Sequence, residues 1–328
     1  EMWDGDTYTF TLRQDLRPTP DGSPKDPQVI PVDIGLIGPD GTEVLATQTL
    51  ILTDLAETFR FEGIPKGAVL SVLRDFSAPV IMHHAQSAAD KAHLLAHDTD
   101  PFNRWDAGHA LARQVLLDMV LTDAAPDTAF LDGLAAVLRD DTLDPAFRAL
   151  ALSLPSETDP AQAIAQAGSQ PDPLAIHHAR EALKLQIAQH LQDIVPRIYA
   201  QMTVDGPYDP NAMDAGKRAL GNVVLGLISR IDGGAQATAQ FDAANNMTQQ
   251  LAALACLLRV GKGANASAVF YDQWKSDRLV MDKWFGLQVR CAAANAAVAT
   301  AQKLTDHPKF DWKNPNRFRA VIGGLTGN

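Results

Sequence analysis

Glutamate is scarce in this sequence. Only six of the 328 residues are glutamate, and none of them directly follows a histidine. The helical zinc-peptidase motif His-Glu-x-x-His needs two metal-binding histidines one turn apart and a glutamate that serves as general base. The chain cannot supply this motif, and it also contains no Gly-x-Ser-x-Gly nucleophile elbow. Two common forms of hydrolase active site are therefore excluded from this sequence.

Basic residues, cysteines and long apolar runs are also few. The 28 lysines and arginines stand against 39 aspartates and glutamates, and the net charge of -11 argues against a general nucleic-acid-binding protein. The apolar runs are far shorter than the roughly 18 to 20 residues that a membrane span needs. Cys256 and Cys291 lack metal-ligand spacing, which predicts two buried free thiols. With no secretory signal in the first residues, the sequence predicts a soluble cytoplasmic protein without nucleic acid or a membrane span among its partners.

Residues 1–82 have the alternating pattern of half-buried β-strands. Apolar and polar side chains alternate at residues 8–13, for example, and stretches rich in proline and glycine separate the strand-like segments. We predict strands at residues 8–13, 32–36, 44–52, 58–61, 68–74 and 79–82. Short strands at this density predict a small antiparallel β-sandwich.

The pattern changes near residue 82, and residues 83–328 have the three-and-four spacing of amphipathic helices. Asp-Pro pairs mark helix starts, because the aspartate accepts hydrogen bonds from the first free N–H groups and proline has no N–H to leave unpaired. Such pairs occur at residues 100–101, 144–145, 159–160, 172–173 and 209–210. Many short helices with brief connections predict an all-α superhelical or solenoid domain, with an irregular bundle as the alternative.

Two histidines come nearest to a metal site. His93 and His97 have the i,i+4 spacing that places both imidazoles on one face of a helix. Candidates for further ligands are His83, His84, Asp98, Asp100 and His109. No acid–base residue accompanies the pair, so we favour a partly exposed helix flank over a metal site.

Seven longer strings carry more information than these motifs. They are DFSAPV at 75–80, RWDA at 104–107, LSLPSE at 152–157, DPLAI at 172–176 with REAL at 180–183, ANNMT at 244–248, LVMDKWF at 279–285 and NPNR at 314–317. In this order they resemble the C-terminal half of bacterial aminopeptidase N, a zinc peptidase of the gluzincin class. The resemblance extends from about Tyr8 to Gly327.

The resemblance implies an immunoglobulin-like β-sandwich at residues 1–82 and a superhelical α-domain at residues 83–328, truncated at its C-terminal end. In this family the zinc helix and the motif Gly-x-Met-Glu-Asn belong to a catalytic domain that precedes the sandwich, and neither string occurs here. The resemblance therefore implies no catalytic residue and no cofactor in this chain, with zinc bound by the parent enzyme's catalytic domain. That domain, and peptide substrates in the intact enzyme, are the implied partners.

The resemblance also implies a non-catalytic role, in which the helical domain encloses the active-site chamber and restricts the access of peptides. Asn314, Asn316, Arg317 and Arg319 are the predicted chamber-lining residues, since their string matches the family and guanidinium groups suit a peptide carboxylate. The alternative is that Asn314 caps a helix beginning at Pro315 and that the arginines pair with acidic neighbours.

Two other functions compete with this prediction. One is a stand-alone helical-solenoid adaptor that holds a partner protein on its concave face. The other is a self-sufficient hydrolase that uses His177 or the pair of His93 and His97. If the helix stack ends before its natural cap, we also expect an uncovered apolar face near residues 322–325 and self-association through it.

Overall fold

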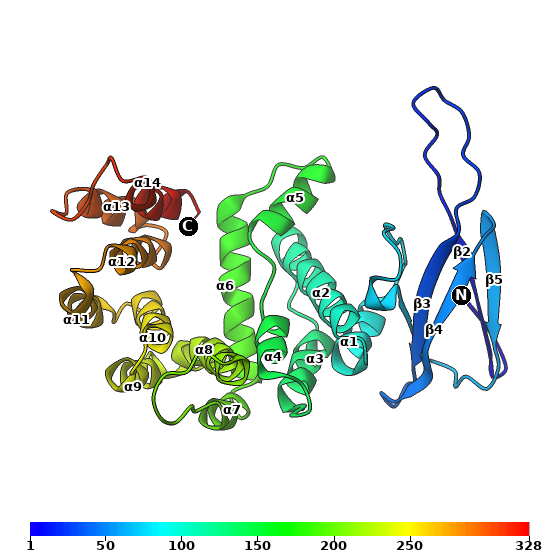
Figure 1. The fold of residues 1–328 in the computed structure, drawn as a ribbon, viewed down its shortest axis with the longest axis horizontal. Helices are drawn as coiled ribbons and strands as arrows, with labels where there is room; N and C mark the ends of the chain where they lie inside the picture. Colours follow the sequence, from blue (N-terminus) through cyan, green and yellow to red (C-terminus); the bar gives the residue numbers. More distant parts are fainter. Residues whose placement is uncertain (328) are drawn as a thin grey trace. The chain divides into compact units, whose positions relative to one another are not determined.

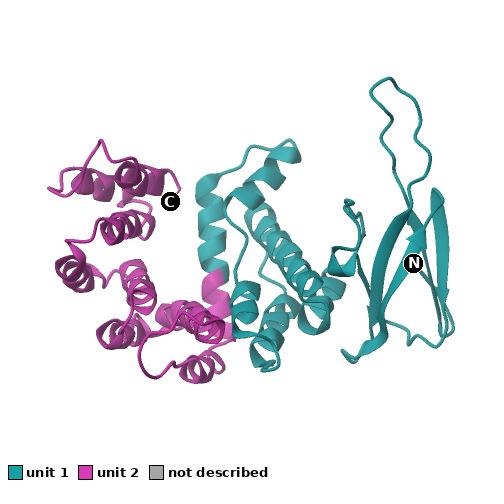
Figure 2. Ribbon diagram, viewed as in Figure 1, with its two compact units in different colours: residues 1–183 teal, residues 184–328 magenta. Residues whose placement is uncertain are grey.

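The computed structural model describes residues 1–327, which form strands up to residue 72 and helices thereafter (Figure 1). Two compact units, residues 1–183 and 184–328, are coloured separately in Figure 2. The strands are β1 (Met2–Asp4), β2 (Thr7–Arg13), β3 (Ile30–Ile37), β4 (Glu43–Leu52), β5 (Ala56–Phe61) and β6 (Val69–Val72). The division between the units lies within one helix, whereas the change from strand to helix lies between residues 72 and 88.

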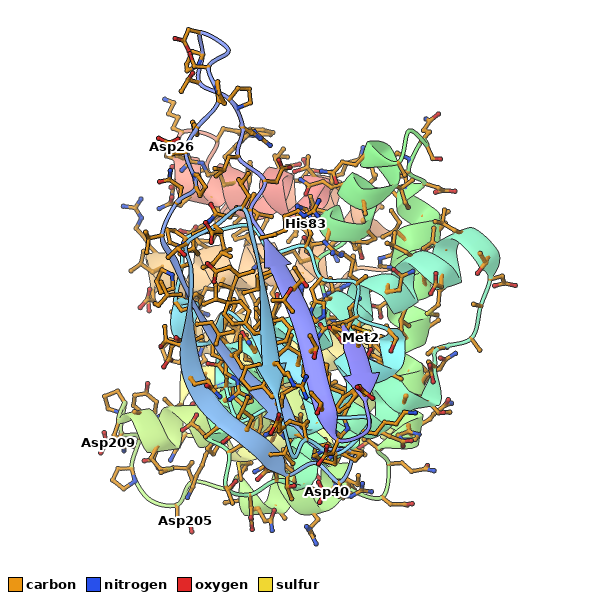
Figure 3. The ribbon with its side chains drawn as sticks, turned by 90° about the vertical axis from the view of Figure 1, so that its right-hand side faces the viewer. Met2, Asp26, Asp40, His83, Asp205 and Asp209 are labelled. Carbon is orange, nitrogen blue, oxygen red and sulfur yellow. The ribbon has the colours of Figure 1, made fainter. Side chains whose placement is uncertain are left out.

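The strands form two three-stranded antiparallel sheets, with the orders β1-β2-β5 and β4-β3-β6. Alternate side chains of both sheets point inward and share one core, which includes Tyr8 and Phe10 from β2 and Ile34 and Leu36 from β3. The predicted antiparallel sandwich is therefore confirmed. Figure 3 shows the β2–β3 loop, which carries Asp26, extending far beyond the strands.

The prediction of a strand at residues 79–82 is wrong. These residues form neither strand nor helix, and they follow the short 3₁₀ helix η1 (Arg74–Phe76). Val80 and Ile81 are 40% and 84% exposed, so their apolar side chains have no sheet face to cover. An apolar run predicts a strand only when a neighbouring strand is available to pair with it.

The helices of the first unit begin at residue 88. They are α1 (Ala88–His97), α2 (Pro101–Thr122), α3 (Thr128–Arg139), α4 (Pro145–Ala151), α5 (Thr158–Gln166) and α6 (Pro173–His190), the last of which continues into the second unit. Leu95 of α1 lies against glycines of two neighbouring helices: a Cβ atom would come within 2.6 Å of it at Gly108 and within 2.9 Å at Gly133. These glycines let α1 pack closely against α2 and α3.

The second unit is entirely helical in its described part. Its elements are α7 (Val195–Gln201), α8 (Ala212–Asp232), α9 (Ala235–Ala243), α10 (Met247–Arg259), α11 (Ala264–Trp274), α12 (Arg278–Arg290), α13 (Ala297–Thr305), α14 (Pro315–Phe318), the π-helix η2 (Arg319–Gly323) and α15 (Gly324–Thr326). Phe270, Trp284 and Phe285 lie in its core, and the Trp284 indole N–H donates to Ser267. Within residues 1–327, no helix is long and apolar enough to cross a membrane.

The Asp-Pro pairs predict three of five helix starts correctly. Asp100, Asp144 and Asp172 accept hydrogen bonds from the first N–H groups of α2, α4 and α6. Asp159 lies one residue inside α5, where its carboxylate accepts from the Ser156 backbone. Asp209 precedes α8, but the cap is an asparagine two residues later. A competing side chain caps the helix at α8, whereas no side chain caps α5.

Candidate functional site

The four predicted chamber-lining residues lie on or beside α14. The Asn314 side chain caps this helix by accepting from the backbone N–H groups of Asn316 and Arg317, at 3.1 and 3.5 Å. Asn316 and Arg319 are exposed, and their side chains make no hydrogen bond or ion pair within residues 1–327. These two side chains are therefore free to contact another molecule.

Arg317 is placed differently, because only 4% of it is exposed. Its Nε donates to Asp282 Oδ1 at 2.5 Å, and its two terminal nitrogens donate to the backbone oxygens of Lys309 and Arg278. The guanidinium carbon also lies 4.8 Å from the centre of the Phe285 ring. Capping by Asn314 and pairing of Arg317 with an acidic neighbour are what the alternative interpretation of this string predicts.

The apolar residues that follow α14 are not left uncovered. Val321 is fully buried, and Ile322 and Leu325 are partly buried against the core of the second unit. The uncovered face expected near residues 322–325 is therefore not seen, because these side chains pack against their own unit. Self-association through this segment stays a prediction.

The histidine pair on α1 lies on a helix flank. The ring centres of His93 and His97 are 5.0 Å apart, and His93 Nε2 is 2.8 Å from the backbone oxygen of Gly38. Most of the candidate ligands are engaged elsewhere: His84 with Glu1, Asp98 with Arg74, Asp100 with the start of α2, and His109 with the Trp105 ring. No group of three or more histidine, cysteine, aspartate or glutamate side chains in the described chain is placed to hold a metal ion.

The sequence analysis missed a buried ionic network around Arg74. This side chain is 1% exposed and donates to Glu43 at 2.6 Å, Asp98 at 2.9 Å, Thr47 at 2.9 Å and Ser71 at 3.0 Å. The network joins β4 and β6 to the end of α1. In the sequence, this network is marked only by the position of Arg74 directly before the string at residues 75–80. That string does not indicate the distant partners of Arg74.

The two carboxylates of this network respond differently to their surroundings. Burial raises the pKa of Asp98, although Ser71 and Arg74 act to lower it, and its Oδ2 has no hydrogen-bond partner in the described chain. Burial also opposes ionisation of Glu43, but hydrogen bonds from Arg74 and Thr99 hold its pKa below the ordinary value. Glu43 is therefore the carboxylate that the network holds more firmly in its charged form. Asp98 is the carboxylate that Arg74 contacts in the buried interior.

A cavity of about 330 Å³ lies within the second unit, among α7, α8, α9 and the segment that leads to α10. These elements belong to the magenta part of Figure 2. The lining residues are mostly amides and small side chains, with Tyr199 from α7, Arg218, Gly221 and Asn222 from α8, and Gln240 from α9 among them. In the sequence, only the string at residues 244–248 touches this site, through Ala244 and Asn245.

Gln240 organises one wall of the cavity. It is 7% exposed, its Oε1 accepts from the Tyr199 hydroxyl at 2.8 Å, and its Nε2 donates to Asn222 Oδ1 at 3.0 Å and to the Gln249 backbone at 2.9 Å. Burial raises the pKa of Tyr199, so this hydroxyl remains protonated and donates. The fixed amides give the cavity a defined set of hydrogen-bonding groups.

Two known domain families match the chain, one after the other. Residues 1–85 match DUF3458, a domain of unknown function with an Ig-like fold, and residues 88–328 match DUF3458_C, described as ARM repeats. The chain belongs to the DUF3458_C family, and a DUF3458 domain precedes that region. These matches also confirm the predicted fold class, in which an immunoglobulin-like β-domain precedes a helical repeat domain.

Aminopeptidases from three bacteria are similar to this chain. It is 39% identical over 300 residues to aminopeptidase N of Caulobacter vibrioides and 32% identical over 339 residues to aminopeptidase N of Escherichia coli, matches that cover 88% and 98% of the chain. The crystal structure of Legionella pneumophila aminopeptidase A in complex with aspartic acid matches with a TM-score of 0.77 and 25% identity over 98% of the chain. The predicted resemblance to the C-terminal half of aminopeptidase N is confirmed.

The DUF3458_C chain is much shorter than these relatives. It spans 34% of the Caulobacter protein and 38% of the Escherichia and Legionella proteins. The similarity therefore concerns one part of an aminopeptidase, and the activity of the whole relatives belongs to a larger molecule.

Proposed function

We propose that the chain is a non-catalytic C-terminal part of an aminopeptidase N, in which the helical domain encloses the active-site chamber and restricts the access of peptides. The extent of the similarity carries the proposal: up to 98% of the chain aligns with aminopeptidase N, but only 38% of that enzyme is covered. The uncovered part is long enough for a separate catalytic domain, which would be the main partner of this chain. The enzyme as a whole would remove N-terminal residues from peptides.

Zinc belongs, in this proposal, to the uncovered part of the enzyme. The residues of this chain do not fit a zinc site, because His93 and His97 are not joined by a third metal-binding side chain and the sequence lacks His-Glu-x-x-His. The chemistry that zinc supplies in such enzymes is the activation of a water molecule. The residues described here would instead shape the space around the peptide and exclude bulk water from it.

We propose Asn316 and Arg319 as the residues that face the chamber. Both are exposed, and their side chains make no hydrogen bond in the described chain, whereas Asn314 and Arg317 hold α14 in position. A guanidinium group at Arg319 would interact with the carboxylate end of a bound peptide. We retain the proposed domain boundary near residue 82, and a cytoplasmic location stays a prediction.

The test uses the intact enzyme that contains this chain. The change Arg319→Ala should lower kcat/KM for longer peptides by roughly three- to tenfold, chiefly through KM, because a charge-assisted hydrogen bond to the peptide is lost. Dipeptides, which end before the chamber wall, should be affected less. The matched control is Arg60→Ala, which removes an exposed arginine of the β-sandwich.

An unchanged kcat/KM at every peptide length would contradict the lining role of Arg319. The isolated chain, assayed with and without zinc on a chromogenic aminoacyl substrate, provides the background rate. Turnover by the isolated chain that disappears in a His93→Ala variant would contradict the proposal as a whole and support the hydrolase alternative.

A further inference from the structure

The cavity of the second unit is lined by one cation and no anion. Arg218 is the only charged residue among those that line it. Figure 3 shows Asp205 and Asp209, from the loop that precedes α8, at the periphery of the ribbon. The carboxylate of Asp209 accepts from the Asn211 backbone. No carboxylate among the lining residues therefore accompanies the Arg218 guanidinium.

The guanidinium of Arg218 has spare hydrogen-bonding capacity. The residue is 3% exposed, yet within residues 1–327 it forms no ion pair and only one hydrogen bond, from Nη2 to the backbone oxygen of Asp209 at 2.5 Å. Its carbon lies 4.6 Å from the centre of the Tyr208 ring. An arginine has five N–H donors, and burying its charge is costly unless an anion compensates for it.

Two neighbours of Arg218 on α8, Gly221 and Asn222, lie in the same wall of the cavity. Arg218, Gly221 and Asn222 have i,i+3 and i,i+4 spacing, which places them on one face of the helix. The Asn222 Oδ1 accepts from Gln240, and its amide nitrogen makes no hydrogen bond in the described chain. At Gly221 a Cβ atom would lie 3.4 Å from Met202 Cβ, an ordinary van der Waals contact, so alanine fits this position without a clash. A glycine inside a helix is less favourable than alanine, and as a lining residue Gly221 leaves space in the cavity that a methyl group would take up.

We propose that this cavity binds the terminal carboxylate of a short peptide, with Arg218 as its counterion and the surrounding amides as partners for the adjacent peptide group. Arginine recognises carboxylates through parallel N–H donors, and amide side chains both donate to and accept from a peptide bond. The volume of about 330 Å³ lies at the lower end of the range for small-molecule sites, which fits a dipeptide-sized ligand. The inference rests on the residues of this cavity and does not depend on the proposed chamber role.

Three probes distinguish binding of a terminal carboxylate from binding of a side-chain carboxylate. N-acetyl-dialanine carries a terminal carboxylate, its C-terminal amide has none, and N-acetyl-aspartate α-amide carries one only on its side chain. Binding of each probe to the full 328-residue chain is measured by isothermal titration calorimetry and by changes in the NMR signals of the probe. We expect N-acetyl-dialanine to bind, the amide not to bind, and the aspartate derivative to bind more weakly.

Variants of the chain locate the site. Arg218→Gln should weaken binding of N-acetyl-dialanine by roughly 10- to 100-fold, because a charge-assisted hydrogen bond is lost. Gly221→Ala narrows the cavity while improving the helix, so it should weaken binding in a chain that remains folded. The matched control, Arg60→Gln, removes an exposed arginine of the other unit and should leave binding unchanged.

Each outcome decides the proposal. Loss of binding in both α8 variants, with retention in the control, supports it. If no probe binds the wild-type chain, or if Gly221→Ala and Arg218→Gln both bind as tightly as the wild-type chain, Arg218 serves only to hold the loop through Asp209 and the proposal is wrong. If Arg218→Gln does not fold, as judged by circular dichroism, the Gly221→Ala result decides. Equal binding of all three probes also overturns the proposal.

Discussion

One buried arginine from each unit, Arg74 in the first and Arg218 in the second, shows two opposite surroundings for a buried charge. In the first unit, Arg74 uses its nitrogens on two carboxylates and two hydroxyls, and both of the ionic contacts are shorter than 3 Å. In the second unit, Arg218 is almost as buried but contacts one backbone oxygen and the face of Tyr208. Two arginines that are similarly buried therefore serve different functions. Arg74 completes a structural network, whereas Arg218 keeps N–H donors available for a ligand.

The closed network of the first unit also holds a strained segment in place. Leu73, Asp75 and Phe76 have φ angles of 58°, 55° and 55°, in the left-handed region that side chains other than glycine rarely adopt. Each such residue costs on the order of 1–3 kcal/mol when it is bulky. Arg74 anchors the middle of this segment, and Asp100 accepts from the Asp75 backbone at 3.1 Å.

The largest effect is expected from Arg74→Leu. This change leaves Asp98, which is 1% exposed, as a buried carboxylate without its cation, and it releases the strained segment. Breaking a buried ion pair by removing one partner costs about 3–5 kcal/mol. Chemical denaturation, read by fluorescence and circular dichroism, measures the free energy of unfolding.

Two further arginine variants sharpen this comparison. Arg60→Leu breaks an exposed pair with Glu62 and should cost less than about 1 kcal/mol. Arg218→Leu should also cost less than Arg74→Leu, because no carboxylate is left unpaired by it. If Arg218→Leu were as destabilising as Arg74→Leu, the distinction between a structural and a ligand-binding arginine would fail.

A smaller loss is expected from Gly35→Ala in β3. A Cβ atom at this position would lie 2.2 Å from Arg74 Nη1 and 2.3 Å from its guanidinium carbon, so the buried side chain would have to move away from its partners. Overpacking of this kind typically costs about 1–3 kcal/mol. The measurement is again the free energy of unfolding.

The matched control for this change is Gly226→Ala in α8. A Cβ atom at Gly226 meets no atom within 4 Å, and alanine is the better helix former, so the variant should be as stable as the parent or up to about 1 kcal/mol more stable. A neutral Gly35→Ala would show that the Arg74 network tolerates displacement. In that case, the network would not be the rigid element of the first unit.

Local signals in the sequence predict local structure well. The period-two alternation of β2 gives the inward-facing Tyr8 and Phe10, and Asp100 and Asp144 mark helix starts through contacts within three residues. The same signal fails at Asp209, where a nearby asparagine caps the helix instead. Small differences in free energy decide which of two nearby residues caps a helix. Sequence patterns do not rank Asp209 and Asn211 as caps of α8.

The candidate sites depend on distant residues, which no local pattern connects. The partners of Arg74 lie at Glu43 and Asp98, 31 and 24 positions away. The cavity takes its wall from residues between Tyr199 and Gln249, which only the packing of several helices brings together. Arg317 illustrates the opposite error: its string matches a family, but whether its side chain faces a chamber or a core is decided by Asp282, 35 positions earlier.

The smallest effect is expected from a modest change in pH, which acts on one histidine of lowered pKa in each unit. His307 of the second unit packs against the rings of Tyr271, Trp284 and Phe285. Burial, together with the charges of Arg317 and Lys309, holds its pKa below the ordinary value of 6.5. As the pH falls from 7 through 6.5 toward the folded pKa, the unfolded chain binds a proton that the folded chain resists, so stability decreases.

The first unit also contains a histidine of this kind. Partial burial lowers the pKa of His97, so this unit should lose stability over the same pH range, and a further loss follows at lower pH. The pKa of Glu43 lies below its ordinary value of 4.5, so its contribution to stability is present above 4.5 and is lost as the pH falls through the folded pKa. Amide hydrogen exchange followed by mass spectrometry resolves the units, and His307→Gln should abolish the acceleration between pH 7 and 6 in the second unit while leaving that of the first unit unchanged. Acceleration in the second unit that persists in His307→Gln would show that His307 is not the group responsible.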